Sequence, residues 1–134
     1  MDDGYLYDFG ENNAGVCRLH VTAEAGQTIT MHHGEHLIDG KLDLTNLTCD
    51  RTTGSQKDVY ICKAGENVYT PTFTYHGFQY VWIRGLRPEQ ATEDALTYLV
   101  MHTQLPVRGG FRCSDETVNR IHIPYKICAR RAGD

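Results

Sequence analysis

Residues 72–83 read TFTYHGFQYVWI and form the longest stretch of this chain that is rich in aromatic and β-branched side chains. Such side chains are typical of β-strands. In a continuous strand, Phe78, Tyr80 and Trp82 share one face, and Val81 lies on the other. The stretch therefore predicts a long β-strand with an aromatic face.

Shorter segments on both sides of this stretch repeat the alternation of apolar and polar residues. They are residues 16–21, 27–31, 57–62 and 95–102. Sequences that favour turns separate the segments: 12–15, 24–26, 39–40, 53–55, 64–67 and 84–85. Many short strands joined by turns indicate an all-β fold, an antiparallel β-sandwich or jelly roll.

The last part of the chain has a different pattern. Residues 114–117 (SDET) offer the Ser114 hydroxyl as an N-cap, followed by two acids in the first turn, where the helix dipole favours them. Val118 and Ile121 recur at helical spacing until Pro124 stops the run. The sequence predicts one short C-terminal helix.

Composition limits the classes of function. A chain of 134 residues fits one domain and is too short for a large catalytic barrel. A net charge of −4 gives no electrostatic reason to bind nucleic acid, and no apolar run is long enough to span a membrane. We therefore expect that the chain binds neither nucleic acid nor a membrane.

The cysteines are odd in number, scattered and free of C-x-x-C pairs, so we expect free thiols, some of them buried. Together with an N-terminus unlike a signal peptide, they favour a cytoplasmic location.

The densest group of potential metal ligands is residues 32–36, HHGEH. His32 and His33 are adjacent, so a strand directs them to opposite faces. We therefore expect no metal and no cofactor; a small metal enzyme using His32, His33 or His36 stays as an alternative. No phosphate-binding glycine loop or nucleophile elbow occurs, and no pair of acids can be placed across a cleft. No catalytic residue is predicted.

Several phrases together resemble one family. They are residues 8–15 (DFGENNAG), 33–37 (HGEHL), 58–61 (DVYI), 71–81 (PTFTYHGFQYV), 111–115 (FRCSD) and 119–121 (NRI). In this order they are similar to the concanavalin-like β-sandwich domain of bacterial α-L-rhamnosidases, glycoside hydrolase family 78. Gln79 stands where arginine is usual in that family.

The resemblance implies a parent enzyme that hydrolyses terminal α-L-rhamnosyl bonds, with its catalytic acids on a separate (α/α)6 barrel. Residues 1–112 would be a non-catalytic β-sandwich domain packed against that barrel, and residues 113–134 the junction and the start of the catalytic domain. We predict the interdomain interface at these polar and glycine-rich positions: Asp8, Asn12, Tyr75, His76 and Gly77.

The aromatic row in residues 72–83 leaves a second hypothesis open. Such a row is either core, or covered by a neighbouring domain, or a platform on which sugar rings stack. The first two readings are favoured. The alternative is an autonomous carbohydrate-binding module for rhamnose-containing glycans, with Tyr80, Trp82 or His76 contacting the sugar.

Overall fold

The computed structural model describes residues 3–45, 56–103 and 109–121. Two compact units are present, Met1–Val100 and Met101–Asp134. The first holds every strand of the described residues: β1 (Gly4–Ala23), β2 (Thr28–Gly34), β3 (His36–Ile38), β4 (Lys41–Asp43), β5 (Lys57–Ile61), β6 (Gly65–Tyr69), β7 (His76–Arg84) and β8 (Leu96–Val100). Two 3-10 turns, η2 (Pro88–Gln90) and η3 (Glu93–Ala95), precede β8. The domain boundary at residue 112 stays a prediction.

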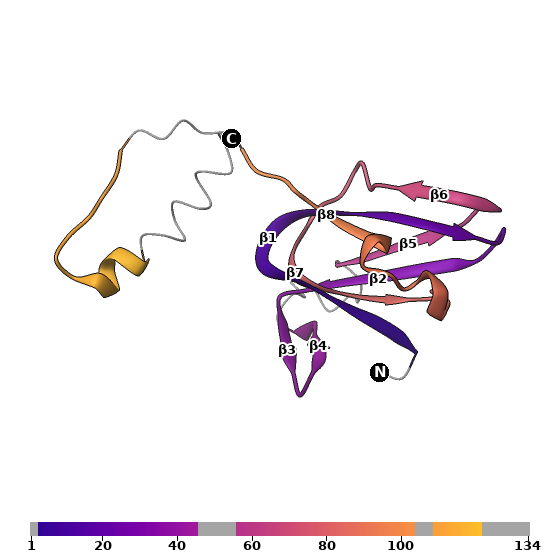
Figure 1. The fold of residues 1–134 in the computed structure, drawn as a ribbon, viewed down its shortest axis with the longest axis horizontal. Coiled ribbons are helices and arrows are strands. Elements are labelled where there is room, and N and C mark those ends of the chain that lie inside the picture. Colours follow the sequence, from indigo (N-terminus) through magenta and orange to yellow (C-terminus); the bar gives the residue numbers. More distant parts are fainter. Residues whose placement is uncertain (1–2, 46–55, 104–108, 122–134) are drawn as a thin grey trace. The chain divides into compact units, whose positions relative to one another are not determined.

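The strands pair antiparallel in the order β5-β2-β7-β1-β6, and β8 also pairs with β1. The long β1 bends and serves two layers (Figure 1). Its first half pairs with β7, and its second half lies between β6 and β8. The pairing with β7 is irregular between Asp8 and Asn13, within a stretch that contains Gly10 at φ 76°. The predicted all-β sandwich is confirmed.

The core lies between these two layers. Every second residue of β1 and β2 points into it, as the sequence pattern predicts, and residues of β7 complete it. These core residues are Cys17, Leu19, Val21, Ile29, Met31, Phe78, Val81 and Ile83.

Cys17 and Cys62 are buried free thiols, and Cys113 is partly exposed; Cys49 and Cys128 lie outside the described residues. Burial, with a contribution from the nearby Asp58 charge, raises the pKa of Cys17 to about 12. That thiol is therefore a packing residue and not a nucleophile.

Strand β7 differs from the prediction in its faces. It begins at His76, so residues 72–75 are not part of it. Phe78 is fully buried with Val81, whereas Tyr80 and Trp82 are only half-buried. The core-facing positions of β7, which we call its inward phase, therefore shift by one residue between Phe78 and Val81, beside the irregular pairing with β1. The prediction that Phe78 shares a face with Tyr80 and Trp82 is wrong.

Two predicted turns are strands instead. Residues 12–15 lie inside β1, and residues 65–67 open β6. In β6, the fully buried Asn67 donates to the carbonyls of Lys63 and Gly65, so its turn-forming side chain closes the tight connection from β5 while its backbone pairs with β1. The turn at 39–40 is confirmed, with positive φ at both residues joining β3 to β4. The turn predicted at 53–55 lies outside the described residues.

The second unit contains the predicted short helix, at residues 116–121. Its cap is Asp115 and not Ser114. The Asp115 carboxylate accepts hydrogen bonds from the backbone N–H groups of Thr117, at 2.8 Å, and Val118, at 3.3 Å. No helix in the described ranges is long and apolar enough to cross a membrane.

Candidate functional site

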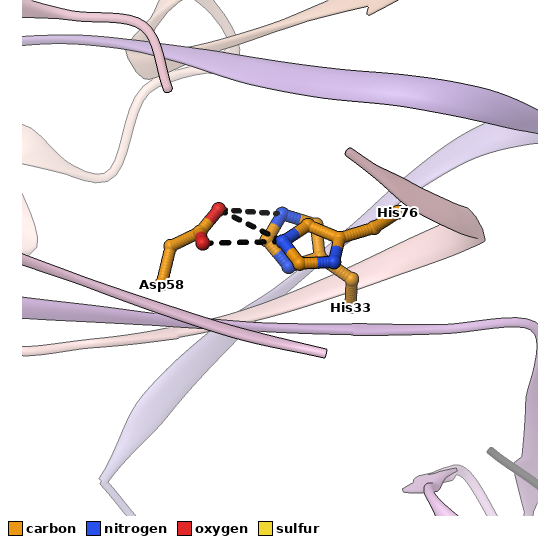
Figure 2. A group of neighbouring side chains, drawn as sticks. All are labelled: His33, Asp58 and His76. Atoms are coloured by element: carbon orange, nitrogen blue, oxygen red, sulfur yellow. Dashed lines mark hydrogen bonds and ion pairs between the residues drawn. The ribbon is translucent and has the colours of Figure 1, made fainter. Parts of the chain in front are cut away.

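Three polar side chains meet inside the first unit. His33 comes from β2, Asp58 from β5 and His76 from the first position of β7, and their exposed fractions are 0%, 8% and 3%. His33 continues the inward phase of Ile29 and Met31 along β2. Figure 2 shows both imidazoles directed toward the Asp58 carboxylate. We call these residues the His33–Asp58–His76 cluster.

Hydrogen bonding and ring stacking hold the cluster together. The Nε2–H of His76 donates to both oxygens of Asp58, at 3.1 Å each. The Nε2 atom of His33 lies 3.9 Å from one of these oxygens. The two imidazoles stack with ring centroids 4.2 Å apart, and the Phe78 ring makes a T-shaped contact with His33, with centroids 4.7 Å apart.

The protonation of His33 follows from its surroundings. Its Nδ1–H donates to the backbone carbonyl of Gln56 at 3.2 Å, so Nε2 carries the lone pair. Burial, reinforced by His76, lowers the pKa of His33 to about 4. Among the described residues, its Nε2 is one of two buried side-chain atoms without a hydrogen-bond partner. A neutral imidazole therefore presents an unused acceptor to a buried carboxylate.

The chemistry open to this cluster is restricted by its burial. A buried carboxylate needs a cation or strong donors beside it, which His76 supplies. With all three side chains more than nine-tenths buried, the cluster can hold a proton or an ion but not an organic substrate.

The histidines of residues 32–36 separate in the fold. His32 lies beside Trp82 with ring centroids 6.0 Å apart, and His36 is exposed on β3. Of the proposed ligands His32, His33 and His36, only His33 enters the buried cluster. Its partners Asp58 and His76 lie in two of the phrases that carry the family resemblance, but no spacing rule connects them, because they come together only through the pairing of β5 and β7 with β2.

The predicted interface residues lie near the start of β7, where it pairs with residues 13–15 of β1. The Asn12 amide donates to Glu35 at 3.0 Å, and a Cβ on Gly77 would lie 3.6 Å from the same carboxylate oxygen. Tyr75 is 67% exposed. His76 points into the core instead, so its side chain is not available on the surface of this unit.

Asp8 belongs to the same region through Gln79. The Gln79 amide donates to the Asp8 carboxylate at 3.0 Å, and the Gly10 backbone N–H donates to it at 2.8 Å. These two hydrogen bonds lower the pKa of Asp8. The amide at position 79 thus reaches across to Asp8.

The predicted sugar contacts lie on the outer face of the layer formed by β5, β2, β7 and the first half of β1. Trp82 is directly opposite His32 on one side and Leu6 on the other. The Arg84 guanidinium lies 5.3 Å from the centre of the Trp82 ring system. Tyr80 accepts a hydrogen bond from Gln79 at 3.0 Å. The two aromatic residues are together on one face, but half-buried.

A groove of about 640 Å³ lies elsewhere, between the first half of β1 and the segment from η3 to β8. Sequence reasoning did not identify it. Three aromatic residues at alternate positions of β1 and two acids of η3 contribute to its lining: Tyr5, Tyr7, Phe9, Glu93 and Asp94. The Tyr7 hydroxyl donates to the carbonyl of Thr92 at 2.8 Å and so ties the two walls together. The alternation along β1 was the signal available in the sequence.

Curated relatives cover nearly all of this chain. An α-L-rhamnosidase of Streptomyces avermitilis is 36% identical over 120 residues, which are 88% of this chain and 11% of the relative. One from Formosa agariphila is 31% identical over 124 residues, which are 90% of this chain and 13% of the relative. The chain therefore spans about an eighth of the length of the relatives it matches.

Solved structures and a family model agree with these relatives. The crystal structure of the Streptomyces avermitilis α-L-rhamnosidase complexed with L-rhamnose matches with a TM-score of 0.76 and 34% identity, covering 91% of this chain and 12% of that one. The α-L-rhamnosidase structure from Dictyoglumus thermophilum matches with a TM-score of 0.76 and 39% identity, covering 91% and 14%. The model of the bacterial α-L-rhamnosidase concanavalin-like domain matches residues 1–102. This chain therefore belongs to the family of concanavalin-like domains of bacterial α-L-rhamnosidases.

Proposed function

We propose that this chain serves as a non-catalytic domain of an α-L-rhamnosidase and packs against the catalytic barrel of the same polypeptide. The observation that carries the proposal is the match to one domain of rhamnosidases that are about eight times longer than the matched segment. The chain alone should not hydrolyse an aryl α-L-rhamnoside. Turnover at an ordinary enzymatic rate, with kcat near 10 per second, would overturn the proposal.

The start of β7 is the surface best suited to such an interface. We define the entry patch as the predicted surface residues together with the neighbouring Phe73: Asp8, Asn12, Phe73, Tyr75 and Gly77. Phe73 is fully exposed, and Tyr75 is 67% exposed. Exposed aromatic side chains in a polar surrounding are typical of interfaces, where aromatic residues are enriched. The patch is therefore the proposed contact with the barrel.

Replacing Tyr75 with serine tests this contact. In the isolated chain, we expect the free energy of unfolding to change by no more than about 0.5 kcal/mol, because the side chain is exposed. In the parent polypeptide, the same substitution should lower the stability of the assembled domains by about 1–3 kcal/mol, as loss of an interface aromatic does. Thermal unfolding of both proteins measures the difference.

Val68 on β6 provides a matched control, since it is 60% exposed and apolar but lies outside the entry patch. Val68→Ser should leave both proteins within about 0.5 kcal/mol of the parent values. Equal effects of Tyr75→Ser in the isolated chain and in the parent polypeptide would exclude Tyr75 from the interface.

The groove beside η3 supports a second candidate function, binding of rhamnosyl oligosaccharides. Its volume lies within the range of about 300–1,000 Å³ usual for small-ligand sites, and its tyrosine rings and carboxylates are groups that contact sugar faces and hydroxyls. Calorimetric titration with rhamnose and rhamnosyl oligosaccharides tests this function. Saturable heat that Tyr5→Ala removes and Trp82→Ala leaves would place the sugar in the groove, and the reverse would place it on the Tyr80–Trp82 face. No heat at millimolar sugar would leave the domain its packing role alone.

A further inference from the structure

We propose that the His33–Asp58–His76 cluster is a binding site for one divalent transition-metal ion, with Zn²⁺ as the best match, which joins β2, β5 and β7 in the core. Neither the family match nor the packing role requires such a site. The ion would act structurally, since three strands far apart in sequence supply its ligands and the surrounding core excludes substrate.

The donor atoms and their spacing fit such an ion. Two imidazole nitrogens and a carboxylate are a common set for Zn²⁺ and its neighbours in the transition series, whereas Ca²⁺ and Mg²⁺ prefer oxygen ligands. Ligands about 2.0–2.1 Å from a tetrahedral ion lie roughly 3.4 Å from one another. The separations of the two Nε2 atoms from Asp58 Oδ2, 3.1 Å for His76 and 3.9 Å for His33, lie on either side of this value. One donor atom from each residue lies within 4.8 Å of the other two.

The unused lone pair of His33 points independently to a cation. Nδ1 of His33 is engaged with the Gln56 carbonyl, which is the arrangement that orients a metal-binding imidazole and leaves Nε2 free to coordinate. Gln56, whose backbone carbonyl accepts this hydrogen bond, also carries the second buried acceptor without a hydrogen-bond partner, its side-chain Oε1. A buried acceptor that faces a carboxylate is costly unless a proton donor or a cation lies between them.

Binding requires two adjustments of the cluster. The proton on Nε2 of His76 must leave, and the His76 ring must turn about its Cβ–Cγ bond so that both lone pairs meet at the ion while His33 keeps its hydrogen bond to Gln56. This torsion is broad for histidine, so the turn is a small local change. Because the three ligands converge only in the folded chain, the ion would enter during folding, and its binding would contribute to stability.

The test begins with the unaltered chain, refolded in the presence of Zn²⁺ and then dialysed. We expect one equivalent of zinc by elemental analysis and a higher thermal midpoint than for the chain refolded with EDTA. Co²⁺ in place of Zn²⁺ should give visible absorption bands and paramagnetically shifted imidazole N–H signals. A folded chain that retains no zinc and shows no shifted imidazole signals would overturn the proposal.

Substitutions then locate the ion. His33→Gln and His76→Gln should each weaken zinc binding by more than the roughly 10- to 100-fold that loss of an outer-shell partner costs. His36→Gln removes an exposed histidine of β3 and should leave one equivalent bound. Zinc lost from His36→Gln but kept by His33→Gln would assign the metal to the surface and contradict the proposal. If the two core variants do not fold, the shifted signals of the unaltered chain decide.

Discussion

Replacing His76 with alanine is expected to lower the free energy of unfolding of this chain by about 3–5 kcal/mol. The substitution leaves the Asp58 carboxylate, 8% exposed, without the N–H that donates to both of its oxygens. His33 cannot replace that donor, because its own Nε2 presents a lone pair. Urea unfolding in EDTA measures the loss, and the chelator removes any contribution from a bound ion. A domain of this size is stable by about 5–15 kcal/mol, so this loss is a large share of its total stability.

A second histidine–carboxylate pair in the same chain provides the control. His20 of β1 and Glu66 of β6 are 2.8 Å apart, with side chains 52% and 71% exposed. His20→Ala should cost no more than about 1 kcal/mol, because water solvates the remaining carboxylate. The double variant His76→Ala with Asp58→Ala should cost less than the sum of the single variants, since no carboxylate is then left buried without its donor. Equal small losses for His76→Ala and His20→Ala would show that burial does not set the strength of the Asp58–His76 pair.

The polarity of β5 explains why this cluster was not predicted. Alternation alone cannot say which face of residues 57–61 is inward, and the β-branched residues suggest the wrong one. Val59 and Ile61 are 48% and 67% exposed, while Asp58 is buried. Asp58 is acceptable inside only because His76 donates to it, and that partner arrives from a strand 18 residues further along the chain. A rule based on neighbours in sequence carries no information about such a contact.

Other parts of the fold followed from local pattern. Cys17, Leu19 and Val21 in β1 fill the core as alternation predicts, because this part of β1 has one face in water and the other in the core. The first half of β1 was missed for the opposite reason. Its asparagines and glycines favour turns locally, and pairing with β7 overrides this preference. The candidate interface residues could be named from the family phrases, but the inward orientation of His76 required the structure.

Phe78→Ala is the second substitution expected to have a large effect, about 3–5 kcal/mol in the free energy of unfolding. The Phe78 side chain is fully buried, stacks on Tyr98 with ring centroids 4.1 Å apart, and makes a T-shaped contact with Phe9 with centroids 6.0 Å apart. Its ring also covers His33 at 4.7 Å. Truncation leaves a cavity that rigid strands on both sides cannot close, so the cost exceeds the transfer free energy of the ring. Chemical denaturation monitored by far-UV circular dichroism measures it.

Trp82→Ala, four residues further along β7, separates the two possible arrangements of this strand. If the inward phase were constant, Phe78 and Trp82 would share an environment and their removal would cost similar amounts. With the phase shifted between Phe78 and Val81, Trp82 loses contacts on the outer face, among them those with His32 and the Arg84 guanidinium, and we expect about 1 kcal/mol. A cost for Trp82→Ala as large as that for Phe78→Ala would contradict the shift. The same shift places His76 inward beside Asp58. His76 and Phe78, two residues apart, both face the core, whereas the next core-facing residue, Val81, follows Phe78 by three. The ratio of the two losses therefore also tests the strand geometry on which the buried cluster depends.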